Sequence, residues 1–197
     1  MKKLLFTMVL LVFFAAGVSA QDVKPFSIYV GGGVTVPSGD FADAYKMGFH
    51  GMAALGYSVA PMFQILAKGE YHSFAFDNTG AFAKAEYAGE TKFSGGSLNI
   101  IMAGVAGKLA PSAPLIPIKP YGLAGIGLAS MGITEQTIGE DKIEAPDRVN
   151  KLYFEIGAGV EMKLAPAVAF FVQARYVSIS TEGTSTNMIP ITVGVKF

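Results

Sequence analysis

Few residues of this chain could carry out chemistry: two histidines, scattered carboxylates and lysines, and no cysteine. His50 and His72, together with Glu70, offer donor atoms of the kind that bind a metal ion. The same three side chains can instead form a hydrogen-bonded set inside the protein, and this is the interpretation we favour. Without cysteine, no disulfide or thiolate metal site can form. We therefore predict no metal and no cofactor.

Nucleophilic catalysis is the other chemistry to consider, and it needs a serine, a histidine and an acid that converge on one surface. The nearest candidate pair, His72 and Ser73, is adjacent in sequence. Neighbouring side chains of a β-strand point to opposite faces, so this pair could not act together on a strand. A distant serine would be needed, and we predict that the protein is not an enzyme.

The first 20 residues have the pattern of a secretion signal. Lys2 and Lys3 precede an almost wholly apolar run, and small residues precede a cleavage site after Ala20. The apolar run is shorter than the ~20 residues that a membrane-spanning helix needs. We therefore predict a signal peptide at residues 1–20 and one domain at residues 21–197.

The composition of the chain excludes some classes of protein. Removing Lys2 and Lys3 leaves 13 of the 15 basic residues against 15 acidic ones, which gives no indication of a nucleic-acid partner. The chain is 51% hydrophobic with a mean hydropathy of +0.44, yet its longest later charge-free stretch, 47–67, is interrupted by glycine and proline. Closed β-barrels are the other structure that satisfies the backbone in lipid, with strands of ~9–11 residues.

Strands are indicated by apolar residues at every second position, most clearly at the C-terminus. One face there reads Ile189, Ile191, Val193, Val195 and Phe197; the other reads Met188, Pro190, Thr192, Gly194 and Lys196. The segments predicted as strands are 26–36, 48–57, 62–76, 93–109, 119–132, 151–164, 168–180 and 188–197. The fourth and fifth are rich in glycine and alanine, which predicts a bulge or bend there. The fold class is therefore all-β: an eight-stranded antiparallel up-and-down transmembrane β-barrel.

The connections between these strands alternate in length. The long ones are 37–47, 77–92, 133–150 and 181–187, and the short ones are 58–61, 110–118 and 165–167. Outer-membrane barrels have long external loops and short periplasmic turns, with both chain ends in the periplasm. The long connections hold eleven acidic residues against five basic ones; one cluster is Glu135, Glu140, Asp141, Glu144 and Asp147. This cluster could bind a divalent cation or a basic partner, although it lacks the spacing of a calcium loop.

The face predicted to point into the barrel is polar and charged. An eight-stranded barrel is just wide enough inside for side chains to fill it. We therefore predict that charges pair across the lumen and close it, in preference to an ion path. The residues of this predicted structural network are Lys68, Glu70, His72, Glu155 and Arg175.

On these features the chain resembles the small eight-stranded outer-membrane barrels typified by OmpX and the OmpA transmembrane domain. The resemblance covers the mature chain and rests on the signal peptide, the alternating segments and the terminal Phe197. In that family a C-terminal Phe after alternating apolar residues is the signal read by the barrel-assembly machinery, which implies that role for Phe197. Two departures are Pro190 within the last strand, which fits best near the outer rim, and the lack of a peptidoglycan-binding domain after the barrel.

The resemblance implies an integral protein of the cell outer membrane in a Gram-negative-type envelope. The expected partners are outer-membrane lipid, the barrel-assembly machinery and a possible extracellular ligand of the acidic loops. We expect a non-enzymatic role, structural or in surface interaction. The alternatives are a transport barrel for small or hydrophobic solutes and a lipid-modifying outer-membrane enzyme.

Overall fold

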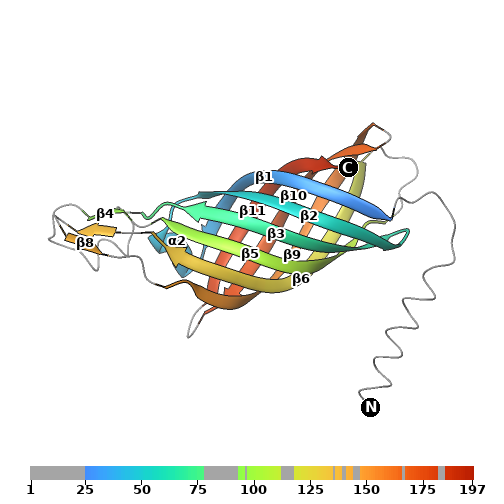
Figure 1. Ribbon diagram of the computed structural model, residues 1–197. Coiled ribbons are helices and arrows are strands. Elements are labelled where there is room, and N and C mark those ends of the chain that lie inside the picture. The colour runs from blue at the N-terminus through green and yellow to red at the C-terminus, as the bar shows by residue number, and fades with distance from the viewer. Residues whose placement is uncertain are drawn as a thin grey trace, which may run out of the picture.

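Eight antiparallel strands close on themselves into a barrel, with a small separate sheet beyond one end (Figure 1). The computed structural model describes residues 25–77, 93–95, 97–111, 118–134, 136–138, 141–143, 147–165, 167–181 and 185–197. The predicted signal peptide at residues 1–20 lies outside this part of the chain, so its cleavage stays a prediction. Within the described ranges, no helix has the length and hydropathy needed to cross a membrane.

The barrel strands follow one another in chain order. They are β1 (Phe26–Ser38), β2 (Gly48–Ala60), β3 (Phe63–Phe74), β5 (Leu98–Leu109), β6 (Ile118–Ile133), β9 (Val149–Ala165), β10 (Val168–Ser180) and β11 (Ser185–Lys196). Each strand pairs antiparallel with the next, and β1 pairs with β11 to close the cylinder. The predicted fold class, an eight-stranded up-and-down barrel, is confirmed. We call the end with the turns β2–β3, β5–β6 and β9–β10 the short-turn end and the other the long-loop end.

Alternating burial along each strand separates the lumen from the outer surface. In β11, Met188 and Thr192 are fully buried, whereas Ile189 and Ile191 are exposed. Because side chains of a strand alternate between faces, the buried residues point into the barrel and the exposed ones outward. The side assignment predicted for the last strand is therefore confirmed, and the same alternation runs through β9 and β3.

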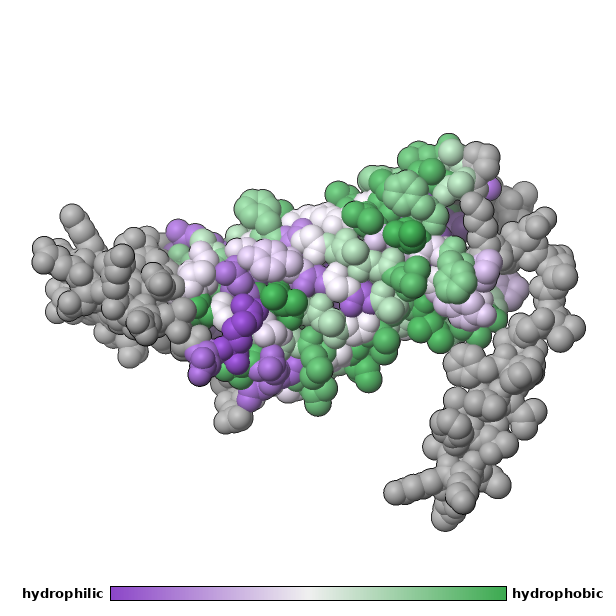
Figure 2. Space-filling model, viewed as in Figure 1, coloured by the Kyte–Doolittle hydropathy of each residue, from purple (hydrophilic) through white to green (hydrophobic). Residues whose placement is uncertain are grey.

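The outward face forms an apolar band. Figure 2 shows hydrophobic residues gathered over the part of the barrel nearer the short-turn end, and hydrophilic ones toward the long-loop end. Aromatic rings lie near the short-turn end: the Phe26 and Tyr57 ring centroids are 5.2 Å apart, and both residues are exposed. Exposed apolar side chains flanked by aromatic residues are typical of a lipid-facing barrel surface.

The fourth predicted strand, 93–109, is two strands in the structure. β4 (Phe93–Gly95) pairs with β7 (Gln136–Ile138) in the small sheet that β8 (Asp141–Ile143) completes, and only β5 belongs to the barrel. Gly95 ends β4, and Gly96 and Ser97 follow it in the sequence before β5; glycine weakens a strand because it has no side chain to pack. The connection predicted at 133–150 is thus partly strand.

Of the bulge or bend predicted in the fourth and fifth strands, the bulge is wrong. β5 and β6 pair without a register shift from Leu98↔Ile133 to Leu109↔Gly122. Their glycines instead make room for large side chains of β9. A Cβ at position 104 would clash with the Tyr153 hydroxyl, and one at position 125 would lie 2.8 Å from a carboxylate oxygen of Glu155.

The long connection between β1 and β2 contains a short helix, α2 (Asp40–Ala44), at the long-loop end. Gly39 precedes it with φ 64°, a left-handed conformation that glycine adopts at no steric cost. The helix directs Phe41 onto Phe74, with ring centroids 5.0 Å apart. Tyr45 packs on Phe41 at 5.1 Å, and burial raises the pKa of the Tyr45 phenol above its ordinary value.

Candidate functional site

Four charged side chains meet across the middle of the lumen. Arg175 of β10 donates to both carboxylate oxygens of Glu70 on β3, at 2.6 and 2.8 Å. Arg175 also lies 2.7 Å from a carboxylate oxygen of Glu155 on β9. Lys68 Nζ lies 2.6 Å from Glu70 and 2.5 Å from Glu155. Two cations and two carboxylates thus form one charge-balanced cluster.

This central cluster is shielded from solvent on all sides. The side chains of Lys68, Glu70, Glu155 and Arg175 are each at most 3% exposed. Buried charges are tolerated only when their partners compensate the lost hydration, and the two-point Arg175–Glu70 pair provides the strongest geometry for this. In the described residues, Arg175 Nε and the Tyr153 hydroxyl are the members of this region that remain without a hydrogen bond.

A layer of imidazoles and hydroxyls continues the network toward the long-loop end. His50 and His72 stand directly opposite each other on β2 and β3, with stacked rings 5.1 Å apart. The Thr35 hydroxyl lies 2.9 Å from Nδ1 of His50 and 3.0 Å from Nδ1 of His72. The Nε2 atom of each ring has its own partner: Thr192 for His50 at 2.8 Å, and Glu70 for His72 at 3.1 Å.

The histidine layer joins the central cluster into a single network of eight residues from six strands. All five residues of the predicted lumen network are in it: Lys68, Glu70, His72, Glu155 and Arg175. The sequence predicted a hydrogen-bonded set of His50, His72 and Glu70, but not the bridges that Thr35 and Thr192 form. Hairpin register explains how the histidines meet, but the threonine bridges depend on closure of β1 against both β2 and β11.

The metal-site interpretation of the histidines gains no support from this geometry. In the part of the chain that the structure describes, no group of three His, Cys, Asp or Glu residues is placed to hold a metal ion. Both ring nitrogens of His50 and of His72 are already engaged within the network.

A hydroxyl, an imidazole and a carboxylate do align in Thr35, His72 and Glu70. This order matches that of a nucleophile, a base and an orienting acid. However, Thr35 and His72 are 0% exposed, so no substrate can reach the hydroxyl in this structure. We interpret the alignment as part of the structural network.

An apolar cluster fills the lumen between the histidine layer and the long-loop end. Its buried residues are Phe41, Phe74, Leu98, Ile100, Met102, Ala129, Tyr153, Val177, Ile179 and Met188. They come from α2 and from six barrel strands. This cluster was not predicted, because Phe41 lies in a segment predicted as a loop and its inward direction depends on α2. The lumen is therefore closed by apolar packing on the long-loop side of the charges as well as by the charges themselves.

A second polar layer lies on the short-turn side of the central cluster. Lys108 forms an ion pair with Glu161, and Lys196 lies 3.3 Å from the same carboxylate. The Tyr29 hydroxyl donates to Gln64 at 2.6 Å and accepts from Lys108 at 3.2 Å. The side chain of Lys108 is 3% exposed, although Lys108 lies one residue from the end of β5. Its position on the inward-facing alternation of β5 was the signal that could have shown this.

The predicted assembly residue, Phe197, lies at the short-turn end. Its side chain is 55% exposed on the outward face. Its backbone exchanges two hydrogen bonds with Ile28 of β1, at 2.9 and 3.1 Å, and so extends the closing seam between β1 and β11. Of the acidic loop cluster, Glu135, Glu140 and Glu144 lie outside the described residues, so its cation-binding role stays a prediction.

The closed barrel with an apolar outer surface defines an integral outer-membrane β-barrel. Residues 6–197 match the outer membrane protein beta-barrel domain family, and the chain belongs to this family. It is thus a protein of the cell outer membrane.

Solved structures show the same fold. Neisserial surface protein A superposes with a TM-score of 0.62 at 16% identity, covering 88% of this chain and 96% of that one. A major outer membrane protein from Thermus thermophilus superposes with a TM-score of 0.61 at 14% identity, covering 87% and 97%. Identities this low show a common fold and nothing of function. No curated protein matches the chain.

Proposed function

We propose that this protein is a non-conducting, non-enzymatic barrel whose function lies in the surface that it presents at its long-loop end. The observation that carries this proposal is the Lys68–Glu70–Glu155–Arg175 cluster, which spans the lumen from β3 to β9 and β10. A water-filled pore would leave inward side chains accessible to solvent. Here the four charges of the central cluster are buried instead.

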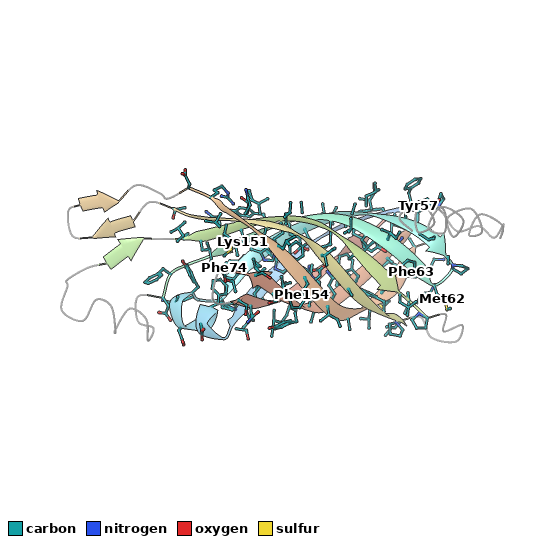
Figure 3. The ribbon with its side chains drawn as sticks, turned by 90° about the horizontal axis from the view of Figure 1, so that it is seen from below. Tyr57, Met62, Phe63, Phe74, Lys151 and Phe154 are labelled. Carbon is teal, nitrogen blue, oxygen red and sulfur yellow. The ribbon has the colours of Figure 1, made fainter. Side chains whose placement is uncertain are left out.

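The apolar cluster around Phe74 supports the same conclusion. It lies at the opposite end of the barrel from Phe63, as Figure 3 shows, and it blocks the lumen between the charges and the long loops. A solute entering from the long-loop end would have to displace α2 and this cluster before reaching a charge. The closed lumen therefore favours a structural or surface-interaction role over transport.

The long loops supply the functional surface in this proposal. They carry eleven of the 15 acidic residues of the chain, so the expected extracellular ligand is a basic one. A barrel closed by buried ion pairs fixes the strand ends from which these loops start. The outer-membrane lipid and the barrel-assembly machinery are the other partners that we propose.

Swelling of proteoliposomes in isotonic solutions of small sugars tests this proposal against the transport alternative. Refolded protein should give no more swelling than empty vesicles, whereas vesicles with a general porin should swell rapidly. A sugar-dependent swelling rate above that of empty vesicles would contradict the closed-barrel proposal and support a transport function.

A further inference from the structure

The short-turn end of the barrel contains a cavity of about 450 Å³ that the network does not use. This volume is within the usual range of small-ligand sites. The cavity lies beyond the Lys108–Glu161 pair and opens toward the turns. Met62 and Phe63, which line it, are labelled at this end in Figure 3. By the orientation rule for outer-membrane barrels, the cavity faces the periplasm.

Lysines from four different strands line this cavity. They are Lys108 of β5, Lys119 of β6, Lys163 of β9 and Lys196 of β11. Each occupies an inward-facing position in the alternation of its strand. The register brings them together: Lys119 stands opposite Glu161, and Lys163 and Lys196 both stand opposite Ala169.

The charges of the cavity are not balanced within the described chain. Glu161 carries the only side-chain carboxylate among the described lining residues, and it already pairs with both Lys108 and Lys196; with the α-carboxylate of Phe197, two negative groups face four lysines. Lys119 and Lys163 are exposed, and the ion pairs seen among the described residues of this end join Glu161 to Lys108 and to Lys196. The central cluster, in contrast, matches two cations with two carboxylates. The cavity thus keeps an excess of positive charge in a concave site, which attracts anions.

The chemistry and number of these lysine side chains indicate which kind of anion the cavity binds. Lysine ammonium groups bind as point charges, and a phosphate group offers three acceptor oxygens that several such groups can share. Lys119, Lys163 and Lys196 approach from three strands, so together they can contact several oxygens of one phosphate group. A carboxylate needs fewer partners: Glu161 is satisfied by two of the cavity's lysines. Phe26, Phe63 and Phe197, whose side chains face outward, contribute to its rim.

We propose that this cavity binds a phosphate-bearing anion, either a soluble phosphate ester of the periplasm or the headgroup of an anionic phospholipid. Lys119 and Lys163 contact the ligand directly. Lys108 and Lys196 hold Glu161, which fixes the floor of the site.

Calorimetric titration of the mature protein, refolded in an uncharged detergent, tests the soluble source with glycerol 3-phosphate as the probe. The lipid source is tested in phosphatidylcholine nanodiscs that contain phosphatidylglycerol, with retained lipid measured by native mass spectrometry. We expect binding in at least one arm, weakened by added salt because exposed charges are screened. Binding of glycerol 3-phosphate alone assigns a soluble ligand, and retention of phosphatidylglycerol alone assigns a headgroup.

The variant Lys119→Glu/Lys163→Glu should weaken this binding by about tenfold or more, because it reverses two contacting charges. Lys119→Gln/Lys163→Gln, which adds no negative charge, should show a smaller loss. Lys46→Glu is the control: it makes the same substitution at one exposed position near the long-loop end and should bind normally. Heat-modifiable gel mobility verifies that each variant is folded. Absence of binding in both arms, or equal binding by the folded lysine variants and the wild type, would overturn the proposal.

Discussion

Glu70 and Arg175 are 105 residues apart in sequence, yet they form a two-point ion pair across the lumen, with N–O distances of 2.6 and 2.8 Å. Glu70 belongs to β3 and Arg175 to β10, two strands that are not neighbours in the barrel. The pair therefore connects opposite parts of the wall through the interior. It thus links two parts of the wall that backbone hydrogen bonds do not connect directly.

Removing Arg175 should destabilise the barrel strongly. In Arg175→Met, Glu70 and Glu155 would share Lys68 as their remaining cation, which leaves one buried negative charge uncompensated. We expect the free energy of unfolding to fall by about 3 kcal/mol, as when one partner of a buried ion pair is deleted. Urea unfolding of the refolded protein in detergent or lipid measures this change.

Two further variants separate charge from packing. Arg175→Met/Glu70→Gln restores neutrality and should recover part of the lost stability. Lys46→Met, which breaks an exposed ion pair with Asp77, should cost less than about 1 kcal/mol. Equal stability of Arg175→Met and the wild type would show that the buried network does not hold the barrel.

The strand glycines offer a second test of how the lumen is packed. Gly104→Ala should destabilise the protein by about 1–3 kcal/mol, the range for overpacking, because the new Cβ would clash with the backbone oxygen of Ile126, at 2.5 Å, and with the Tyr153 hydroxyl. Gly51→Ala, at an outward position with no heavy atom within 4 Å, is the control and should be tolerated. If both variants unfolded at the same urea concentration, the close packing around Gly104 would not exist.

The alternation of the sequence was sufficient to predict the fold and the inward face. Residues such as Glu155 and Arg175 interrupt apolar strands at every second position, so their side was readable from the sequence alone. Which charges pair was not readable, because partners such as Glu70 and Arg175 depend on barrel closure and on strand stagger. The glycines of β5 and β6 were misinterpreted as a bulge because their partner side chains lie on another strand.

Phe197 is expected to matter for assembly. Its side chain faces outward, and its backbone pairs with Ile28 at the closing seam. Deleting Phe197 should lower the amount of folded protein in the outer membrane, while inserted molecules keep their heat-modifiable mobility on gels. Lys196→Ala should insert normally, because Lys196 points inward to Glu161. Normal insertion of the deletion together with loss of insertion in Lys196→Ala would refute this role.

The orientation in the membrane is testable with protease. The connection between β6 and β9, around 134–148, should be cut in intact cells, because the long-loop end is expected to face outside. The short turn near Pro111 should be cut only after the outer membrane is opened. The reverse order of cleavage would invert the topology and place the lysine-lined cavity outside the cell.

Single-channel recording in planar lipid bilayers tests the closed lumen most directly. Refolded wild-type protein should give no stable current steps at moderate voltages, because the ion-pair network and the apolar cluster around Phe74 occupy the lumen in series. Folding of the protein used for the recordings is verified independently by its heat-modifiable mobility on gels. Reproducible current steps of uniform size from verified wild-type protein would contradict the account and show a continuous path through the barrel.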